Sequence, residues 1–290
     1  MCDLLCALPA ATGGAALFAK NSDRPPGERQ VVEWHPPRRD HGSVRATHVE
    51  VAPHPVDTLG VLGSRPAWGW GFEQGVNEAG LAVGNATIYT RLDPRPFPDA
   101  LTGMDLVRLA LERADSARLG VEVIEQLIAS VGQGGSGQDG VRRPYWSSFL
   151  VVDPAAAFVV ETSGPEVAVE QVDEVRAISN RTTIRAFDAA HRHPKQPVER
   201  VVDPRLRASR ALLELRPVTV AALQRHLGSH VGGDDGWTVC MHVEEPGHEE
   251  ATTAAMVAEL PVSGPPVVHV AEGAPCRTPW QRLVVGEPRG

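Results

Sequence analysis

Residues 1–24 of the chain read MCDLLCALPAATGGAALFAKNSDR, a stretch with two apolar runs on either side of a turn-forming ATGG. Short apolar runs separated by glycine-rich turn residues predict two antiparallel strands joined as a hairpin. With the hairpin centred on the first two residues of ATGG, Cys2 lies opposite a residue close to Asn21. We therefore expect the KNSD segment, residues 20–23, to lie beside the amino terminus.

Strand-like and helix-like blocks alternate along the rest of the chain. Strands in blocks, separated by pairs of helices rather than by single crossover helices, favour antiparallel sheets with helices on their outer faces. The polar, proline-bearing segment 181–204 is the candidate linker between domains, but the residues that follow it lack a separate core of obvious size. Residues 1–290 are therefore expected to form one α+β domain. The predicted helices are 104–114, 117–131, 206–216 and 219–232.

Charge and hydropathy exclude several classes of partner. The 290 residues carry a formal net charge of -8 at pH 7, which gives no electrostatic case for nucleic-acid binding. No basic segment precedes an apolar run at the start, and nowhere do about 18 apolar residues follow one another, which argues against a signal peptide and a membrane span. We expect a cytoplasmic protein with a small-molecule partner, and homo-oligomer formation is left open.

The cysteines are sparse and lack CxxC spacing. This pattern predicts reduced thiols rather than a disulfide framework or a zinc cluster, and the scattered histidines likewise predict no metal site and no cofactor. The four cysteines are Cys2, Cys6, Cys240 and Cys276.

Cys2 has a chemical property that depends on its position. If Met1 is removed, this residue carries both a thiol and an α-amine, whose unperturbed pKa of about 7.7–8.0 suits a general base near neutral pH. The amine can take the thiol proton, the thiolate can attack a carbonyl, and water can then hydrolyse the acyl-enzyme. An idle terminal thiol is the competing interpretation of the position alone.

The hairpin brings charged residues to this terminus. A terminal amine that acts as a base needs an acceptor to orient it, which Asp23 can supply, and a nearby cation favours thiolate, which Lys20 or Arg24 can supply. A polar turn with solvated charges is the alternative interpretation of KNSDRP.

Several blocks resemble the secernin and C69 dipeptidase-like family of N-terminal nucleophile hydrolases. They follow one another in family order over nearly the whole chain, and RPAWGWGFEQGVNEAG with GMDLVRLALER is the longest and most irregular match. The resemblance implies a four-layer αββα sandwich with two antiparallel sheets face to face. The other blocks are MCDLLCALPAATGG, FAKNSDRP, GQGG, FLVVD, VVETSG, ISNRTTI, TVCMH and ATTAAMV.

The same resemblance implies roles for individual residues. Cys2 falls at the family's nucleophile, and Asp23 falls where the wider superfamily of penicillin and bile-salt amidases has the acid that binds the terminal amine. Lys20 matches a basic position whose role is either to polarise the thiol or to bind a substrate carboxylate. Asn180 resembles an asparagine that donates to the oxyanion, and Asn85 resembles a second position of the oxyanion hole.

Two further positions remain open at this stage. Trp68 and Trp70 alternate with glycines and either frame a substrate pocket, to which Arg24 is also assigned, or fill the space between sheet and helix. Arg207 or Arg210, near the start of a predicted helix, matches the superfamily's distal charged residue.

Other chemically active side chains are discounted. Cys6 lacks an attached base and is expected to pack in the core. Period two in the expected strand TVCMHV places Cys240 and His242 on one face, where they form a Cys–His dyad, half a metal site or, more commonly, simple packing. His191 and His193 lie in a segment rich in arginine and proline and are expected in a solvated turn.

The sequence thus favours an N-terminal cysteine hydrolase that cleaves an amide bond in a small substrate, nominally a dipeptide. One alternative is an acyl-amide hydrolase of the penicillin or bile-salt type, favoured by an apolar pocket near Trp68 and Trp70. The other is a secernin-like binding or regulatory protein without turnover, for which retention of Met1 is the expected sign.

Overall fold

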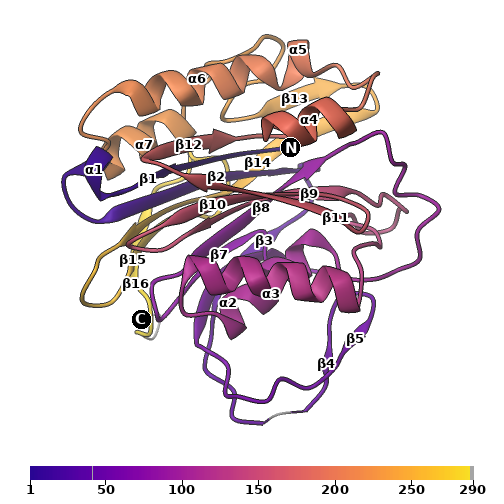
Figure 1. Cartoon of the computed structure of the whole chain (residues 1–290). Helices are drawn as coiled ribbons and strands as arrows, with labels where there is room; N and C mark the ends of the chain where they lie inside the picture. Colours follow the sequence, from indigo (N-terminus) through magenta and orange to yellow (C-terminus); the bar gives the residue numbers. More distant parts are fainter. Residues whose placement is uncertain (41, 288–290) are drawn as a thin grey trace.

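The computed structural model describes residues 1–40 and 42–287, so residues 41 and 288–290 of the expected domain range lie outside it. Two antiparallel sheets face each other, and helices cover the outer face of each (Figure 1). The expected α+β, four-layer αββα architecture is confirmed.

The first sheet, called sheet A, contains both chain segments of the amino-terminal hairpin. Its strands are β1 (Cys2–Ala7), β2 (Ala16–Arg24), β12 (Val175–Ile178), β13 (His242–Glu245), β14 (His248–Leu260), β15 (Val267–Ala271) and β16 (Gln281–Val284). The strand order is β12-β1-β2-β14-β15-β16, with β13 paired to β14.

The second sheet, called sheet B, is built from the middle of the chain. Its strands are β3 (Gln30–His35), β6 (Val61–Pro66), β7 (Gln74–Asn77), β8 (Ala82–Ile88), β9 (Trp146–Val152), β10 (Ala157–Ser163) and β11 (Glu166–Val172). They run in the order β11-β10-β9-β8-β7-β6-β3, and a separate ribbon joins β4 (Val44–Arg45) to β5 (Glu50–Val51).

The helices form the two outer layers (Figure 1). Apolar side chains of α2 and α3 pack on sheet B, and those of α6 and α7 pack on sheet A. No helix in the described ranges is long and apolar enough to cross a membrane. The helices are α1 (Pro9–Thr12), α2 (Gly103–Arg113), α3 (Ala117–Ser130), α4 (Arg185–His191), α5 (Val198–Val201), α6 (Asp203–Glu214) and α7 (Val220–Leu227).

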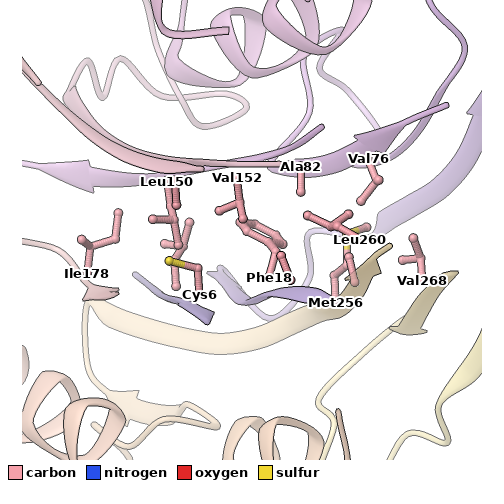
Figure 2. Close-up of a cluster of buried hydrophobic side chains, with 14 of the residues drawn as sticks. Cys6, Phe18, Val76, Ala82, Leu150, Val152, Ile178, Met256, Leu260 and Val268 are labelled. Atoms are coloured by element: carbon pink, nitrogen blue, oxygen red, sulfur yellow. The ribbon is translucent and has the colours of Figure 1, made fainter. Parts of the chain in front are cut away.

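The core between the sheets explains why β1 is apolar on both faces. Figure 2 shows Cys6 and Phe18 of sheet A opposite Leu150 and Val152 of sheet B. The intervening Leu5 belongs to the other core, beneath α6 and α7. Because successive side chains of a strand point to opposite faces, a strand with a core on each side is mostly apolar, and the buried exception in β1, Asp3, is paired with Arg205. The expected packing role of Cys6 is confirmed.

The amino-terminal hairpin forms as expected in register. Cys2 pairs with Ser22, one residue from the expected position near Asn21. Asn21 itself pairs with Asp3. The connection is the short helix α1 rather than a bare turn, and Gly13 ends it in the left-handed conformation with φ 73°. A positive φ favours glycine, which explains the glycine at this point.

Two segments differ from expectation. Residues 238–241 are irregular and β13 starts only at His242, so the expected strand TVCMHV is wrong in its first four residues. The polar segment 181–204, for which no helix was expected, contains α4 and α5, whose few buried side chains include Phe187, Val198 and Val201.

Candidate active site

A cavity of about 70 Å³ opens beside the start of β1. It has room for only a few water-sized groups, with Met1 forming part of its wall. Five of the residues singled out from the sequence line it: Cys2, Asp23, Arg24, Asn85 and Asn180. The other lining residues are Met1, Pro25, Glu73, Thr87, Tyr89, Gly137, Gln138, Arg143, Tyr145 and Glu250.

The amine of Met1 is held in this cavity by two acceptors. It donates to the main-chain oxygen of Asp23 at 2.9 Å and to Glu250 Oε2 at 2.7 Å. Burial lowers the pKa of this amine, but the Glu250 carboxylate and other nearby acidic groups raise it more, so the pKa is raised overall. The cavity thus has a built place for an ammonium group one peptide bond from Cys2.

The nitrogen of Cys2 is oriented by Asn180. The Cys2 N–H donates to Asn180 Oδ1 at 2.8 Å, and Asn180 Nδ2 donates to the main-chain oxygen of Thr87 at 3.0 Å. Asn180 follows β12, the strand that pairs with β1. Its side-chain amide therefore lies beside Cys2, with the oxygen toward the residue-2 nitrogen and the amide donor engaged by Thr87.

Asp23 has one carboxylate oxygen with a partner and one without. Thr252 Oγ1 donates to Asp23 Oδ1 at 2.6 Å, whereas Oδ2 is buried without a hydrogen-bond partner in the described chain. Burial raises the pKa of Asp23 to about 7, against the opposing charges of the terminal amine and Arg205. A buried carboxylate oxygen left without a donor is costly, which indicates that this site is built to receive one.

Arg205 on α6 joins Asp23 and Asn180 from beneath the cavity. Its side chain is fully buried, donates to Asp3 Oδ2 and to Asn180 Oδ1 at 3.2 Å, and lies 4.0 Å from Asp23 Oδ2. The guanidinium is compatible with burial because two carboxylates face it. It supplies fixed positive charge on the side of Asp23 opposite the solvent.

Arg207 and Arg210, the two arginines that the resemblance indicated, do not line the cavity. Arg207 and Arg210 both lie by a surface groove at Asp203 and Asp188, away from Cys2. Both face outward because α6 buries the stripe of Arg205, Leu206 and Ser209 against sheet A. The fully buried arginine of α6 that contacts Asn180 is Arg205, which the sequence interpretation did not consider.

Lys20 lies beneath the cavity rather than in its wall. Its side chain is fully buried, and Nζ donates to Glu73 Oε2 at 3.1 Å and to Gln74 Oε1 at 2.9 Å. Glu73 also accepts from Arg24 Nη1, so one carboxylate serves two cations. Burial raises the pKa of the Cys2 thiol above its ordinary value, and the charge of Lys20 partly opposes that rise.

Glu73 is a residue that the sequence interpretation did not identify. Burial alone would raise its pKa, but Lys20 and Arg24 outweigh burial and lower the pKa to about 2. The carboxylate thus stays charged in the folded protein well below the pH at which an unfolded glutamate protonates, about 4.3.

We expect Glu73→Gln to lower the free energy of unfolding by about 3–5 kcal/mol at neutral pH, because it leaves two buried cations without their shared carboxylate. The folded-state pKa is depressed, so this stabilisation is complete above about pH 4.3 and is lost as the pH falls toward 2. Urea unfolding of both proteins at neutral and acid pH should show the difference shrinking with acidity.

Glu28→Gln is the matched control, since Glu28 also pairs with Arg24 but does not touch Lys20. Glu28→Gln should lower the free energy of unfolding by clearly less than Glu73→Gln does. Equal losses for the two variants, or a difference that grows in acid, would contradict a role for Glu73 as the shared counter-ion.

Of the remaining residues identified from the sequence, Asn85 lines the cavity, whereas Trp68 and Trp70 do not. Asn85 on β8 lines the cavity, and its Oδ1 is buried without a hydrogen-bond partner in the described residues. Trp68 does not line the cavity but lies under Arg24, whose Cζ is 5.9 Å from the ring centroid. Trp70 packs against the core beneath α2, with Arg108 Cζ 4.2 Å above its ring, and is not brought to the cavity.

Sequence reasoning also missed the outer wall of the cavity. Glu250, Arg143 and Tyr145 come from segments that no motif singled out, Tyr89 was not identified as a site residue, and Arg143 Nη2 lies 3.6 Å from Glu250 Oε1. Gly137, from the glycine-rich run interpreted as a surface loop, accepts from Arg24 Nη2 at 2.7 Å. These walls carry charges of both signs close to the thiol.

Solved structures with the same architecture are hydrolases. Two variants of conjugated bile acid hydrolase from Clostridium perfringens, one cysteine-to-alanine and one arginine-to-leucine, match with TM-scores of 0.59 and 0.60, each at 13% identity. The matches cover 100% and 97% of this chain and 94% and 92% of theirs. A Caenorhabditis elegans ortholog of N-acylethanolamine-hydrolyzing acid amidase has a TM-score of 0.50 and 12% identity, over 88% of this chain and 91% of its own.

At these identities the likeness establishes the fold. The chain has the fold of N-terminal nucleophile hydrolases, with a cysteine at position 2. No family model matches the sequence.

Proposed function

We propose that this protein is an N-terminal cysteine hydrolase that cleaves an amide bond in a small substrate through an acyl-enzyme on Cys2. The observation that carries the proposal is the surroundings of the Cys2 nitrogen. Asn180 Oδ1 already accepts from it, and the adjoining Asp23 Oδ2 is buried without a partner. Removal of Met1 would convert this nitrogen into an amine with more protons to donate, which suits both acceptors.

The chemistry follows from these positions. The freed amine takes the proton of Cys2 Sγ, and the sulfur attacks the substrate carbonyl to form a C–S bond and a tetrahedral oxyanion. When the C–N bond breaks, the leaving nitrogen takes that proton from the ammonium. Water then attacks the thioester with the amine again accepting a proton, which releases the acid and restores the thiol.

The asparagines are proposed to stabilise the oxyanion. Asn85 lines the cavity and would donate through its Nδ2 group, and Asn180 can donate through Nδ2 if its bond to Thr87 is shared. Lys20 is proposed to favour the thiolate by charge rather than to bind the substrate, because it lies beneath the cavity wall. Arg24 lines the cavity, but its guanidinium already forms ion pairs with Glu28 and Glu73. We therefore propose that Arg24 is a structural part of the cavity wall and does not bind the substrate.

The substrate class is proposed from the position of the Met1 amine. That ammonium group rests on Glu250, close to the thiol, in the place that the α-ammonium of a bound dipeptide could take. The half-exposed Arg143 beside it could bind the carboxylate at the other end. This charged lining favours a dipeptide-like zwitterion over the large apolar acyl groups named for the structural relatives, which are the second candidate.

The first test is the state of the amino terminus. Intact mass should show loss of Met1, and iodoacetamide at limiting concentration should alkylate Cys2 in the amino-terminal peptide. Protein made in cells depleted of methionine aminopeptidase should retain Met1, react slowly at Cys2 and lack turnover. An active Met1-bearing protein would refute the mechanism, and inertness of the processed protein toward every amide would favour a binding protein without turnover.

The second test is a pair of substrates matched at the scissile bond. Free dipeptides should be cleaved with higher kcat/KM than their N-acetyl counterparts, because acetylation removes the ammonium that Glu250 would bind. Preference for N-acyl amides with long apolar chains would instead support the second candidate.

A further inference from the structure

Four metal-ligating side chains meet at a point that lies outside the candidate active site. One ligand atom from each lies within 4.8 Å of every other: a ring nitrogen of His230, Cys240 Sγ, a ring nitrogen of His242 and Cys276 Sγ. His242 Nε2 is 3.5 Å from Cys240 Sγ and 3.3 Å from Cys276 Sγ. None of the four lines the cavity at Cys2.

Main-chain hydrogen bonds bring His230 and Cys240 together. The Cys240 N–H donates to the oxygen of Ser229 at 2.9 Å, and the Val239 N–H donates to Val231 at 3.0 Å, so the two segments run side by side. His242 begins β13, two residues after Cys240. Three of the four side chains thus come from one loop between α7 and β14.

Cys276 comes from a different loop, between β15 and β16. The N–H groups of Arg277 and Thr278 both donate to Ala274, which forms a turn around Cys276. A Cβ atom on Gly228 would lie 3.3 Å from the main-chain oxygen of Pro275, so the two loops pack closely beside the cluster. The backbone therefore holds the fourth side chain near the other three.

We propose that His230, Cys240, His242 and Cys276 bind one Zn²⁺ ion in a tetrahedral site. Zn²⁺ prefers thiolate and imidazole ligands, at about 2.3 Å for sulfur and about 2.0 Å for nitrogen. A tetrahedron with these bond lengths has nitrogen–sulfur edges of about 3.5 Å, close to the separations of His242 Nε2 from the two sulfurs. Binding releases one proton from each thiol.

The site is structural rather than catalytic. Four protein ligands complete the coordination, which leaves no position for water or substrate. The ion would tie the β15–β16 loop to the loop that precedes β14. That loop reaches the candidate active site, because the Met241 N–H donates to Thr252 Oγ1, which in turn donates to Asp23.

This proposal replaces the expectation of no metal site. For two of the ligands, Cys240 and His242, half a metal site was one of three interpretations of the sequence, and simple packing was the favoured one. The other half lies elsewhere in the chain, at His230 and Cys276, and only the fold unites the halves. A disulfide between the two cysteines and a reactive Cys–His dyad are the competing roles for the cluster.

The test uses the full chain, reduced and stripped with a chelator, with Zn²⁺ and Co²⁺ as the probes. One equivalent of Zn²⁺ should bind, and Co²⁺ should give tetrahedral visible bands together with thiolate-to-cobalt charge-transfer absorption. Cys276→Ser and His230→Ala alter exposed residues and should still fold. Each should weaken binding by more than the roughly 10–100-fold typical of losing an outer-shell partner.

Matched controls show whether weaker binding comes from the loss of a proposed ligand or from the loss of any thiol or imidazole. Cys2→Ala and His193→Ala should each retain one equivalent with unchanged cobalt bands. Zn²⁺ should also protect Cys276 from alkylation, and the chelator should reverse that protection. A Cys240–Cys276 disulfide in the freshly purified protein, or cobalt binding that survives Cys276→Ser, would overturn the proposal. None of these measurements depends on hydrolase activity.

Discussion

Cys2→Ala in the processed protein should lower turnover by at least about 10⁴-fold, because the variant keeps the α-amine and the oxyanion donors but has no nucleophile. The variant should still fold. The Cys2 side chain is 5% exposed and belongs to the core between the sheets, so loss of its sulfur should cost about 1 kcal/mol of stability. Amide cleavage and urea unfolding, measured on the same preparation, check both statements.

Cys6→Ala provides the matched control. Cys6 lies four residues along β1, on the same face and in the same core, but it has no attached amine. It should lose a similar amount of stability or more and keep most of its turnover. If both variants keep full activity, Cys2 is not the nucleophile; if both lose activity in proportion to stability, the thiol of Cys2 acts only in packing.

The part of the site that could be predicted from sequence is local. A hairpin centred on residues 11 and 12 places residue 2 opposite residue 21 by counting alone, because antiparallel pairing fixes the sum of the two numbers, and the observed partner is the next residue, Ser22. Asp23 follows directly after Ser22, and one oxygen of its carboxylate is buried without a hydrogen-bond partner in the described residues. No long-range information is needed for this pair.

Arg205 illustrates what could not be predicted. Its partners, Asp3 and Asn180, are 202 and 25 residues away, and the choice among arginines depends on which stripe of α6 faces sheet A. The resemblance indicated an arginine near the start of this helix but not its rotation. The motif cannot distinguish the three arginines that lie within six residues here, Arg205, Arg207 and Arg210. Only their burial in the folded protein distinguishes them.

Glu250 and Cys276 fall outside any motif for the same reason. Glu250 meets the Met1 amine across 249 residues, and Cys276 lies 34 residues beyond His242. Strand periodicity placed Cys240 beside His242, yet Cys240 lies outside β13, in an irregular segment. Main-chain hydrogen bonds of this loop hold Cys240 and His242 in place, and the alternation of side chains along a strand does not predict such bonds.

Asp23→Asn should lower the acylation rate of the processed protein by about 10²–10⁴-fold, the range expected when a general base loses its competence. Proton transfer from Cys2 Sγ leaves an ammonium, which the proposed contact with Asp23 Oδ2 stabilises. Asparagine can still accept from Thr252 through Oδ1, but it places a neutral donor where the second carboxylate oxygen lay. The thiolate–ammonium pair should therefore form less readily.

The same change should shift the pH dependence of Cys2 alkylation by iodoacetamide in the processed protein to higher pH, because the thiolate is the reactive form and the thiolate–ammonium pair forms less readily. Asp3→Asn is the control, because it also removes a buried carboxylate from Arg205 but has no proposed contact with the Cys2 nitrogen. It should cost stability while keeping the alkylation profile near that of the parent. If Asp23→Asn left both the acylation rate and the alkylation profile unchanged, the carboxylate would only balance the charge of Arg205.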